Sequence, residues 1–281
     1  MRSSNPVFTR NDSFNGRSGA QASPGYTDPS SWQTGTPGDG YGTPPTSIDQ
    51  GRMTIDTVVQ KTAFTLLLVV AGAVASWLVI GPMTTANPQS LQTAYMLAMG
   101  GALIGFGLAM ANSFKKIISP PLVIAYALVE GVFVGAFSKV MTVYVGGDSS
   151  IVMQAVLGTM AAFGGTLAAY KIFDIQVTDK FRKRVTAAVF GFVALALLNF
   201  VLSFFDADFG FRNMGTFGLL VSVAAVVLGV FLLILDFDFV ERGIEAGLPE
   251  RESWRAAFGL TVTLVWIYIE ILRILAILRG D

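Results

Sequence analysis

The sequence predicts an all-α membrane protein, a seven-transmembrane-helix bundle, and three observations lead there. Of the 281 residues, 53% are hydrophobic and 14% are charged, whereas about a quarter of the residues of a soluble domain are charged. The apolar residues gather in runs of about twenty, the length that a helix needs to cross a ~30 Å hydrocarbon core. These runs are continuous and do not alternate with period two, which argues against a membrane β-barrel.

Seven apolar runs follow a polar N-terminal segment. Residues 1–51 are rich in Ser, Gly, Pro, Asn and Thr and lack the apolar core of a signal peptide. Such a composition cannot bury enough apolar surface to offset the entropy of ordering, so we predict a disordered cytoplasmic tail. Residues 52–281 then form the transmembrane domain. We predict spans at residues 62–80, 94–114, 121–143, 151–170, 185–205, 216–239 and 256–278.

Basic residues in the connections predict the orientation of the spans. Arg52 and Lys61 precede the first span, and the first connection, residues 81–93, carries no charge. The connection at residues 171–184 is strongly basic, whereas the one at residues 206–215 contains a single Arg. Basic-rich and basic-poor connections alternate along the whole chain, and cytoplasmic loops are the basic ones. We therefore expect a multi-pass protein of the inner (plasma) membrane, with the N-terminus in the cytoplasm and the C-terminus outside.

The composition excludes several classes of function. There is no cysteine and no histidine, which excludes disulfides, thiolate or imidazole metal sites, and His-based catalysis. The formal net charge is zero, so nucleic acid is not an expected partner. A Gly-x-Gly-Asp protease motif is absent, and the last lysine is Lys183, which excludes a Schiff base in the final helix. We expect no enzyme activity and no tightly bound cofactor.

Small residues predict where helices approach one another closely. The second span contains Gly101-Ala-Leu-Ile-Gly105, and the fourth contains Gly158, Gly164 and Gly165. Glycine lets two backbones come together, and dispersion then drives association within a bilayer. The pattern predicts a packed bundle and says nothing about activity.

Ionisable residues inside the spans are the candidates for function. Glu130 lies in the third span, Asp236 and Asp238 in the sixth, and Glu270 and Arg273 in the seventh. A charge at the centre of a membrane helix costs about 2.5–3.5 kcal/mol, so such residues indicate a functional site by default. One interpretation is a polar, proton-responsive pathway through these residues. The other is structural: Asp238 solvated at the interface, Glu270 paired with Arg273 on the same helix face, and Glu130 bonded to a neighbouring helix.

Asp236 and Glu270 are the candidate site for protons and for transient Ca²⁺. Two carboxyls close together in a low dielectric hold one proton between them, and proton loss creates a repulsion that a cation relieves. Their oxygens suit Ca²⁺, although two carboxylates alone make a weak site. We also predict that residues 241–254 extend the sixth helix to a turn at Gly247-Leu-Pro249. A turn at Pro249 would offset the two acids by roughly 12 Å.

These residues carry a resemblance to a known family. The quoted features are Glu130-Gly131, Leu235-Asp236-Phe237-Asp238 and Tyr268-Ile269-Glu270-Ile271-Leu272. From Met53 to the C-terminus the chain resembles the bacterial branch of the Bax inhibitor (transmembrane Bax inhibitor motif) family, and its opening residues 1–8 resemble an actinobacterial subgroup.

The resemblance implies a seven-helix bundle whose last helix is central, a pH-sensitive Ca²⁺ leak, and a proton sensor at the positions of Asp236 and Glu270. Three features depart from the family pattern. Glu270 stands where an Asp is usual, the connection between the two acids is longer than is typical, and the second span has no Arg to match the family's latch.

Two functions remain open from the sequence. The first is a proton-sensitive Ca²⁺ leak channel. The second is a non-conducting membrane regulator that binds other membrane proteins in a stress response. In the second, residues 1–51 and residues 241–255 would be the docking surfaces.

Overall fold

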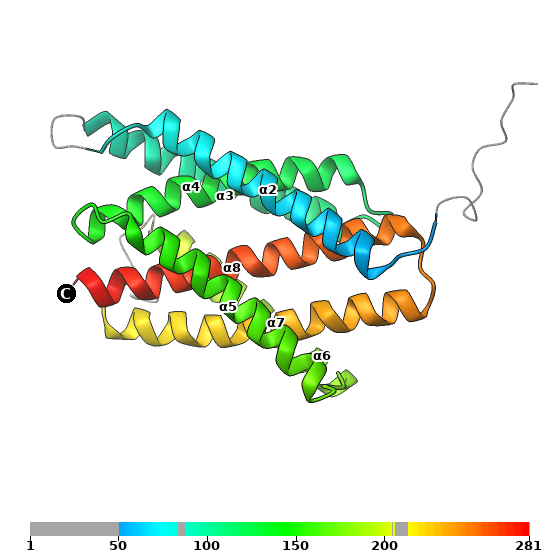
Figure 1. Cartoon of the computed structure of the whole chain (residues 1–281). Coiled ribbons are helices and arrows are strands. Elements are labelled where there is room, and N and C mark those ends of the chain that lie inside the picture. Colours follow the sequence, from blue (N-terminus) through cyan, green and yellow to red (C-terminus); the bar gives the residue numbers. More distant parts are fainter. Residues whose placement is uncertain (1–50, 84–87, 204, 206–212, 281) are drawn as a thin grey trace, which may run out of the picture. The chain divides into compact units, whose positions relative to one another are not determined.

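The computed structural model describes residues 51–83, 88–203, 205 and 213–280 (Figure 1). These residues form seven helices that are long and apolar enough to cross a membrane, as predicted. The predicted tail, residues 1–51, lies outside the described residues except for Gly51. The helices are α2 (Ile55–Ile80), α3 (Pro88–Phe114), α4 (Pro120–Tyr144), α5 (Ser150–Ile172), α6 (Asp179–Ser203), α7 (Thr216–Glu245) and α8 (Ser253–Gly280).

Several helices are longer than the apolar runs that predicted them. Helix α2 begins at Ile55 because Thr54 and Thr57 form a reciprocal capping box, in which each side chain accepts from the other residue's backbone N–H. Helix α7 continues to Glu245, past the apolar run that ends at residue 239, in agreement with the predicted extension of the sixth helix towards Gly247. Hydropathy detects only the apolar part of a helix. The helix itself ends where side chains or other backbone groups cap its terminal N–H and C=O groups.

The turn between α7 and α8 lies where the sequence predicts it. Gly247 adopts the left-handed conformation with φ of 64°, and a short 3₁₀ helix (Glu250–Glu252) leads into α8. The segment before α2 pairs with this turn. The Met53 N–H donates to Leu248 O at 2.8 Å, and the Glu250 N–H donates to Gly51 O at 3.1 Å.

Helix α8 is the central helix of the bundle, as predicted. It packs against α2, α4, α5 and α7, while α3 packs chiefly against α4 and α6 chiefly against α7 (Figure 1). Its buried side chains include Leu264, Ile267, Leu272 and Ala276. A residue on α8 therefore has protein on most sides, which makes this helix the place where polar groups can be sheltered from lipid.

The closest helix contact joins α2 to α4 through glycines. A Cβ on Gly131 would overlap Val69 O, and one on Gly135 would overlap Ala73 O. On the α2 side, a Cβ on Gly72 would lie 2.5 Å from the backbone of α4. The two backbones touch, so any side chain at these positions would force the helices apart.

The expected glycine contacts are confirmed in α3 and only in part in α5. A Cβ on Gly101 would meet Phe133 of α4 at 2.9 Å, and Gly105 faces α4 as well. Gly158 approaches Ile271 of α8, but a Cβ on Gly164 or Gly165 would have no neighbour within 4 Å. The expectation of close packing at those two glycines is therefore wrong, because they lie on the open side of α5.

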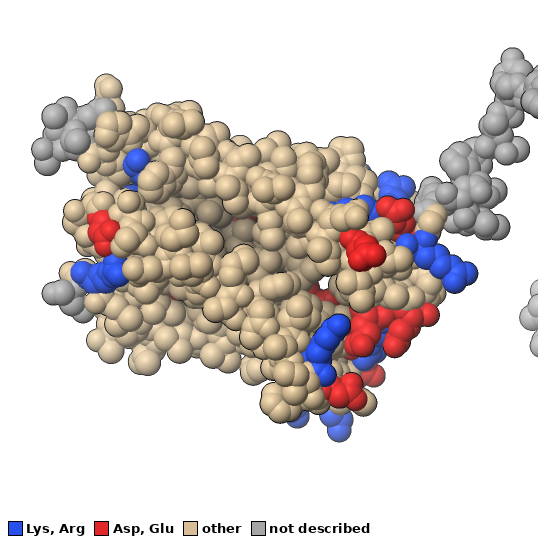
Figure 2. All heavy atoms as spheres, viewed as in Figure 1, with Lys and Arg blue, Asp and Glu red and all other residues tan. Residues whose placement is uncertain are grey.

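Charged side chains gather mainly at the end of the bundle that carries the α7–α8 turn. Figure 2 shows them there, with a broad uncharged belt over the middle of the helices. Many large apolar side chains of the helices are exposed, among them Leu78 and Phe190. In a bilayer the belt would face hydrocarbon, and the chain is a multi-pass membrane protein.

Candidate functional site

Asp236 of α7 is held against the central helix. Its Oδ2 accepts a hydrogen bond from the Thr263 hydroxyl of α8 at 2.7 Å. Gly259 lies one turn earlier on α8, where a Cβ would come within 3.1 Å of the other carboxyl oxygen, Oδ1. The absence of a side chain at Gly259 lets the carboxyl approach α8, and Thr263 supplies the donor that a partly buried carboxylate needs.

Glu270 lies further along the same helix. It follows Thr263 by seven residues, a rise of about 10 Å, and it is buried, as is Arg273 one turn later. Arg273 donates to Asn213 O, just before α7, at 3.2 Å. Among the described residues, no hydrogen bond joins Asp236 to Glu270. The two acids thus lie at two levels along α8, close to the offset expected from a turn at Pro249.

Asp238 is buried in a double ion pair. Its Oδ2 accepts from Arg182 at 2.7 Å and its Oδ1 from Arg242 at 2.9 Å. Arg242 also donates to Val177 O at 2.8 Å. The interpretation of Asp238 as a solvated interfacial residue is therefore wrong: its side chain is 7% exposed. Arg242 lies on α7 like Asp238, whereas Arg182 lies on α6. The ion pair between Arg182 and Asp238 therefore joins the end of α7 to the start of α6.

Glu130 lies in a different part of the bundle. Its carboxyl sits beside Tyr126, one turn earlier on α4. A Cβ on Gly105 of α3 would come within 2.7 Å of Glu130 Oε2. Glu130 thus occupies the contact between α3 and α4, whereas Asp236 and Glu270 lie on or against α8. Since Tyr126 lies on the same helix as Glu130, the interpretation of Glu130 as bonded to a neighbouring helix stays a prediction.

The segment 241–255 is tied down by contacts within the chain. These contacts come from α2, from α5 and from the α3–α4 connection. They are Tyr170 to Glu241 at 2.6 Å, Lys61 to Glu250 at 2.8 Å, Arg251 to Ile118 O at 2.8 Å and Arg255 to Lys116 O at 2.9 Å. Many of the charged groups that the sequence offered as a docking surface therefore close one end of the bundle.

The sequence analysis missed the residues that hold the acids. Thr263 and Gly259 position Asp236, Arg182 holds Asp238, and Gly105 accommodates Glu130. Gly259 and Thr263 are four residues apart and so lie on one face of α8. Gly259 and Thr263 have the same spacing as Gly101 and Gly105, with which the sequence predicted a close helix contact. The same spacing in α8 was the signal for the contact with α7.

The arrangement has a limited chemistry. Each separated carboxyl can take up or release a proton and can touch a passing cation. Ca²⁺ prefers six to eight oxygen ligands, and no group of three or more acids that could hold a metal ion occurs in the part of the chain that the structure describes. The chemistry of these acids is therefore that of transient contact with an ion and not of a tight ion-binding site.

Comparison with known proteins identifies a family. The family model described as Bax inhibitor 1 like matches residues 5–280. No curated protein matches the chain.

Proposed function

The chain belongs to the Bax inhibitor 1 like family, and on that premise we propose that it is a proton-sensitive Ca²⁺ leak channel of the plasma membrane. The proposal has the N-terminus in the cytoplasm and the C-terminus outside. The observation that supports it most is the Asp236 carboxyl held against α8 by Thr263. An acid placed at the contact of two membrane-spanning helices couples proton uptake to the way those helices pack.

Proton uptake at Asp236 would change its contact with α8. The carboxylate only accepts hydrogen bonds, whereas the protonated acid is also a donor. Loss of the negative charge weakens the bond from Thr263, since hydrogen bonds to charged groups are stronger than neutral ones. Because Gly259 places no side chain between the two helices, the change would act directly on the α7–α8 contact.

Glu270, on α8 itself, would act as a second acid beside the Asp236 carboxyl that α7 brings to this helix. A cation moving along α8 would meet Asp236 and Glu270 in turn, about 10 Å apart. Conduction requires sites that bind well enough to admit an ion and weakly enough to release it. Single carboxylates satisfy that requirement, so the proposal includes transient Ca²⁺, no resident cofactor and no enzyme activity.

Ca²⁺ flux into liposomes carrying the purified full chain tests this function. The wild type should leak Ca²⁺ at a rate that changes between pH 5 and pH 8. Asp236→Asn and Glu270→Gln should each flatten that dependence, because each replaces a carboxyl group with an amide. Asp56→Asn is the matched control, since Asp56 is exposed near the start of α2, and it should retain the wild-type profile.

Two results would count against the channel. A wild-type flux that does not vary with pH would remove the proton sensor. A purified protein that conducts at no pH would favour the alternative, a non-conducting regulator that binds another membrane protein. Since many of the charges of segment 241–255 are engaged within the chain, residues 1–51 would then be the docking segment. Deleting them would abolish that binding.

A further inference from the structure

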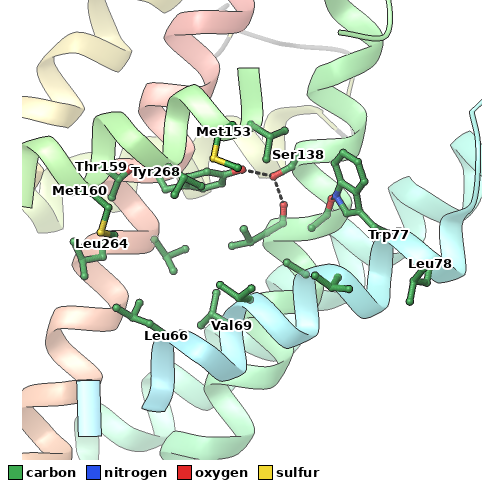
Figure 3. A pocket seen from close by; sticks show the side chains of 18 residues that line it. Leu66, Val69, Trp77, Leu78, Ser138, Met153, Thr159, Met160, Leu264 and Tyr268 are labelled. Carbon is green, nitrogen blue, oxygen red and sulfur yellow. Dashed lines mark hydrogen bonds between the residues drawn. The ribbon is translucent and has the colours of Figure 1, made fainter. Parts of the chain in front are cut away.

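A long apolar groove opens on the side of the bundle between α2 and α5. Its volume is about 610 Å³, within the range of sites that hold small molecules. Side chains of α2 and α5 form its walls, and α4 and α8 form its floor (Figure 3). Figure 2 shows the hollow in the uncharged belt, walled by residues that are neither acidic nor basic.

The polar atoms in the groove are already bonded within the protein. The Ser138 hydroxyl donates to Val134 O and pairs with the Tyr268 hydroxyl at 2.7 Å. The Trp77 indole N–H donates to Gly135 O at 2.8 Å, and the Thr159 hydroxyl donates to Ala155 O at 2.8 Å. A buried water needs two to four polar partners, so the groove favours an apolar occupant over water or an ion.

The length of the groove fits one leaflet of a bilayer. On α2 its wall runs from Leu66 to Leu78, a rise of about 18 Å along the helix. One leaflet of hydrocarbon is half of the ~30 Å core. The groove is also open to the side, where the helices face hydrocarbon, so an acyl chain could enter from the membrane without passing through the protein.

A basic residue marks one end of the groove. The Lys139 ammonium lies 4.3 Å from the ring centroid of Trp77, which lines the groove near the end of α2. No carboxylate among the described residues pairs with Lys139. Trp and Lys are typical of the level of lipid headgroups, where an ammonium group attracts anionic lipid.

We propose that this groove binds one acyl chain of an anionic phospholipid from the bilayer, with the phosphate at Lys139. The chain would lie between α2 and α5, against Tyr268 and Leu264 of the central helix. This site lies apart from the contact of Asp236 with Thr263 and goes beyond the proposed leak function.

Native mass spectrometry of the full chain, released from nanodiscs of equal phosphatidylglycerol and phosphatidylcholine, tests the site. The wild type should retain one lipid, with phosphatidylglycerol preferred. Val156→Phe should reduce that retained lipid several-fold, because Val156 lines the groove and a larger ring would fill it. Leu157→Phe is the matched control: Leu157 is exposed, does not line the groove, and should retain lipid as the wild type does.

The headgroup contact has its own variants. Lys139→Gln should retain the lipid but lose about fivefold in the preference for phosphatidylglycerol, the effect of one basic residue near an anionic headgroup. Lys139→Arg should keep the preference. Equal lipid retention by Val156→Phe and Leu157→Phe would overturn the proposal. So would a wild type that retains no lipid, or a dimer without lipid, which would give the groove to a second copy of the chain.

Discussion

The Thr263 hydroxyl donates to the Asp236 carboxyl at 2.7 Å, and this bond joins α7 to the central helix α8. Its position explains why the two acids picked out by the sequence do not meet. Thr263 lies seven residues before Glu270, so the carboxyl that α7 brings to α8 arrives about two helical turns short of it. A proton sensor in this chain would consist of two separate acids, Asp236 on α7 and Glu270 on α8.

Removing the Thr263 hydroxyl should expose the role of that bond. We expect Thr263→Val to lower the stability of the purified protein by about 1–3 kcal/mol, since the partly buried Asp236 carboxyl loses the hydroxyl that donates to it. The pH dependence of Ca²⁺ flux should shift with it. Thr263→Ser keeps the hydroxyl and should restore both properties. Equal stability and equal pH dependence of flux in Thr263→Val and Thr263→Ser would show that the hydrogen bond to Asp236 contributes to neither property.

Gly131 should tolerate no side chain. A Cβ there would overlap Val69 O of α2, and such overpacking costs about 1–3 kcal/mol or more. Gly131→Ala should therefore lower the midpoint of thermal unfolding, although alanine favours a helix over glycine by about 1 kcal/mol. Gly164→Ala is the control, because a Cβ at Gly164 has open space. It should leave the midpoint unchanged or raise it.

The two arginines on Asp238 should be partly redundant. Arg182→Gln alone leaves Arg242 on the buried carboxylate, so we expect a small loss of stability. Removing both leaves a buried charge without a cation, which is strongly destabilising. A double-mutant cycle measured by thermal unfolding should show the double variant losing more than the sum of the two single losses. Additive losses would mean that each arginine acts alone.

Asp148 should keep its contact with Arg279 at any physiological pH. Asp148 lies between α4 and α5, where the Ser150 hydroxyl, the Ser150 N–H and then Arg279 lower its pKa. A lowered pKa in the folded state adds stability above the unfolded value of about 3.9, and that stability is lost only as the pH falls further. Asp148→Asn should therefore leave the flux profile between pH 5 and pH 8 unchanged. A changed profile would place a pH sensor at this end of the bundle.

Much of the fold could be predicted because membrane-spanning helices show themselves in one dimension. A run of about twenty apolar residues can cross hydrocarbon only as a helix, with its backbone groups bonded within the run. The seven helices and their approximate bounds follow from that constraint, whereas the turn is predicted from the residues Gly247-Leu-Pro249. The presence of ionisable groups at Glu130, Asp236, Asp238 and Glu270 within apolar runs is visible in the same way.

The partners of those acids depended on the tertiary structure. Which side chain faces Asp236 is set by the register between α7 and α8, and that register depends on glycine contacts and on the length of the turn between them. Arg182 reaches Asp238 from a helix more than fifty residues away in the chain, at a distance of 2.7 Å. The sequence determined that acids lie within the bundle, because hydropathy depends only on neighbouring residues along the chain. Only the packing of the helices decided which groups these acids meet, because helix contacts join residues that are far apart in the sequence.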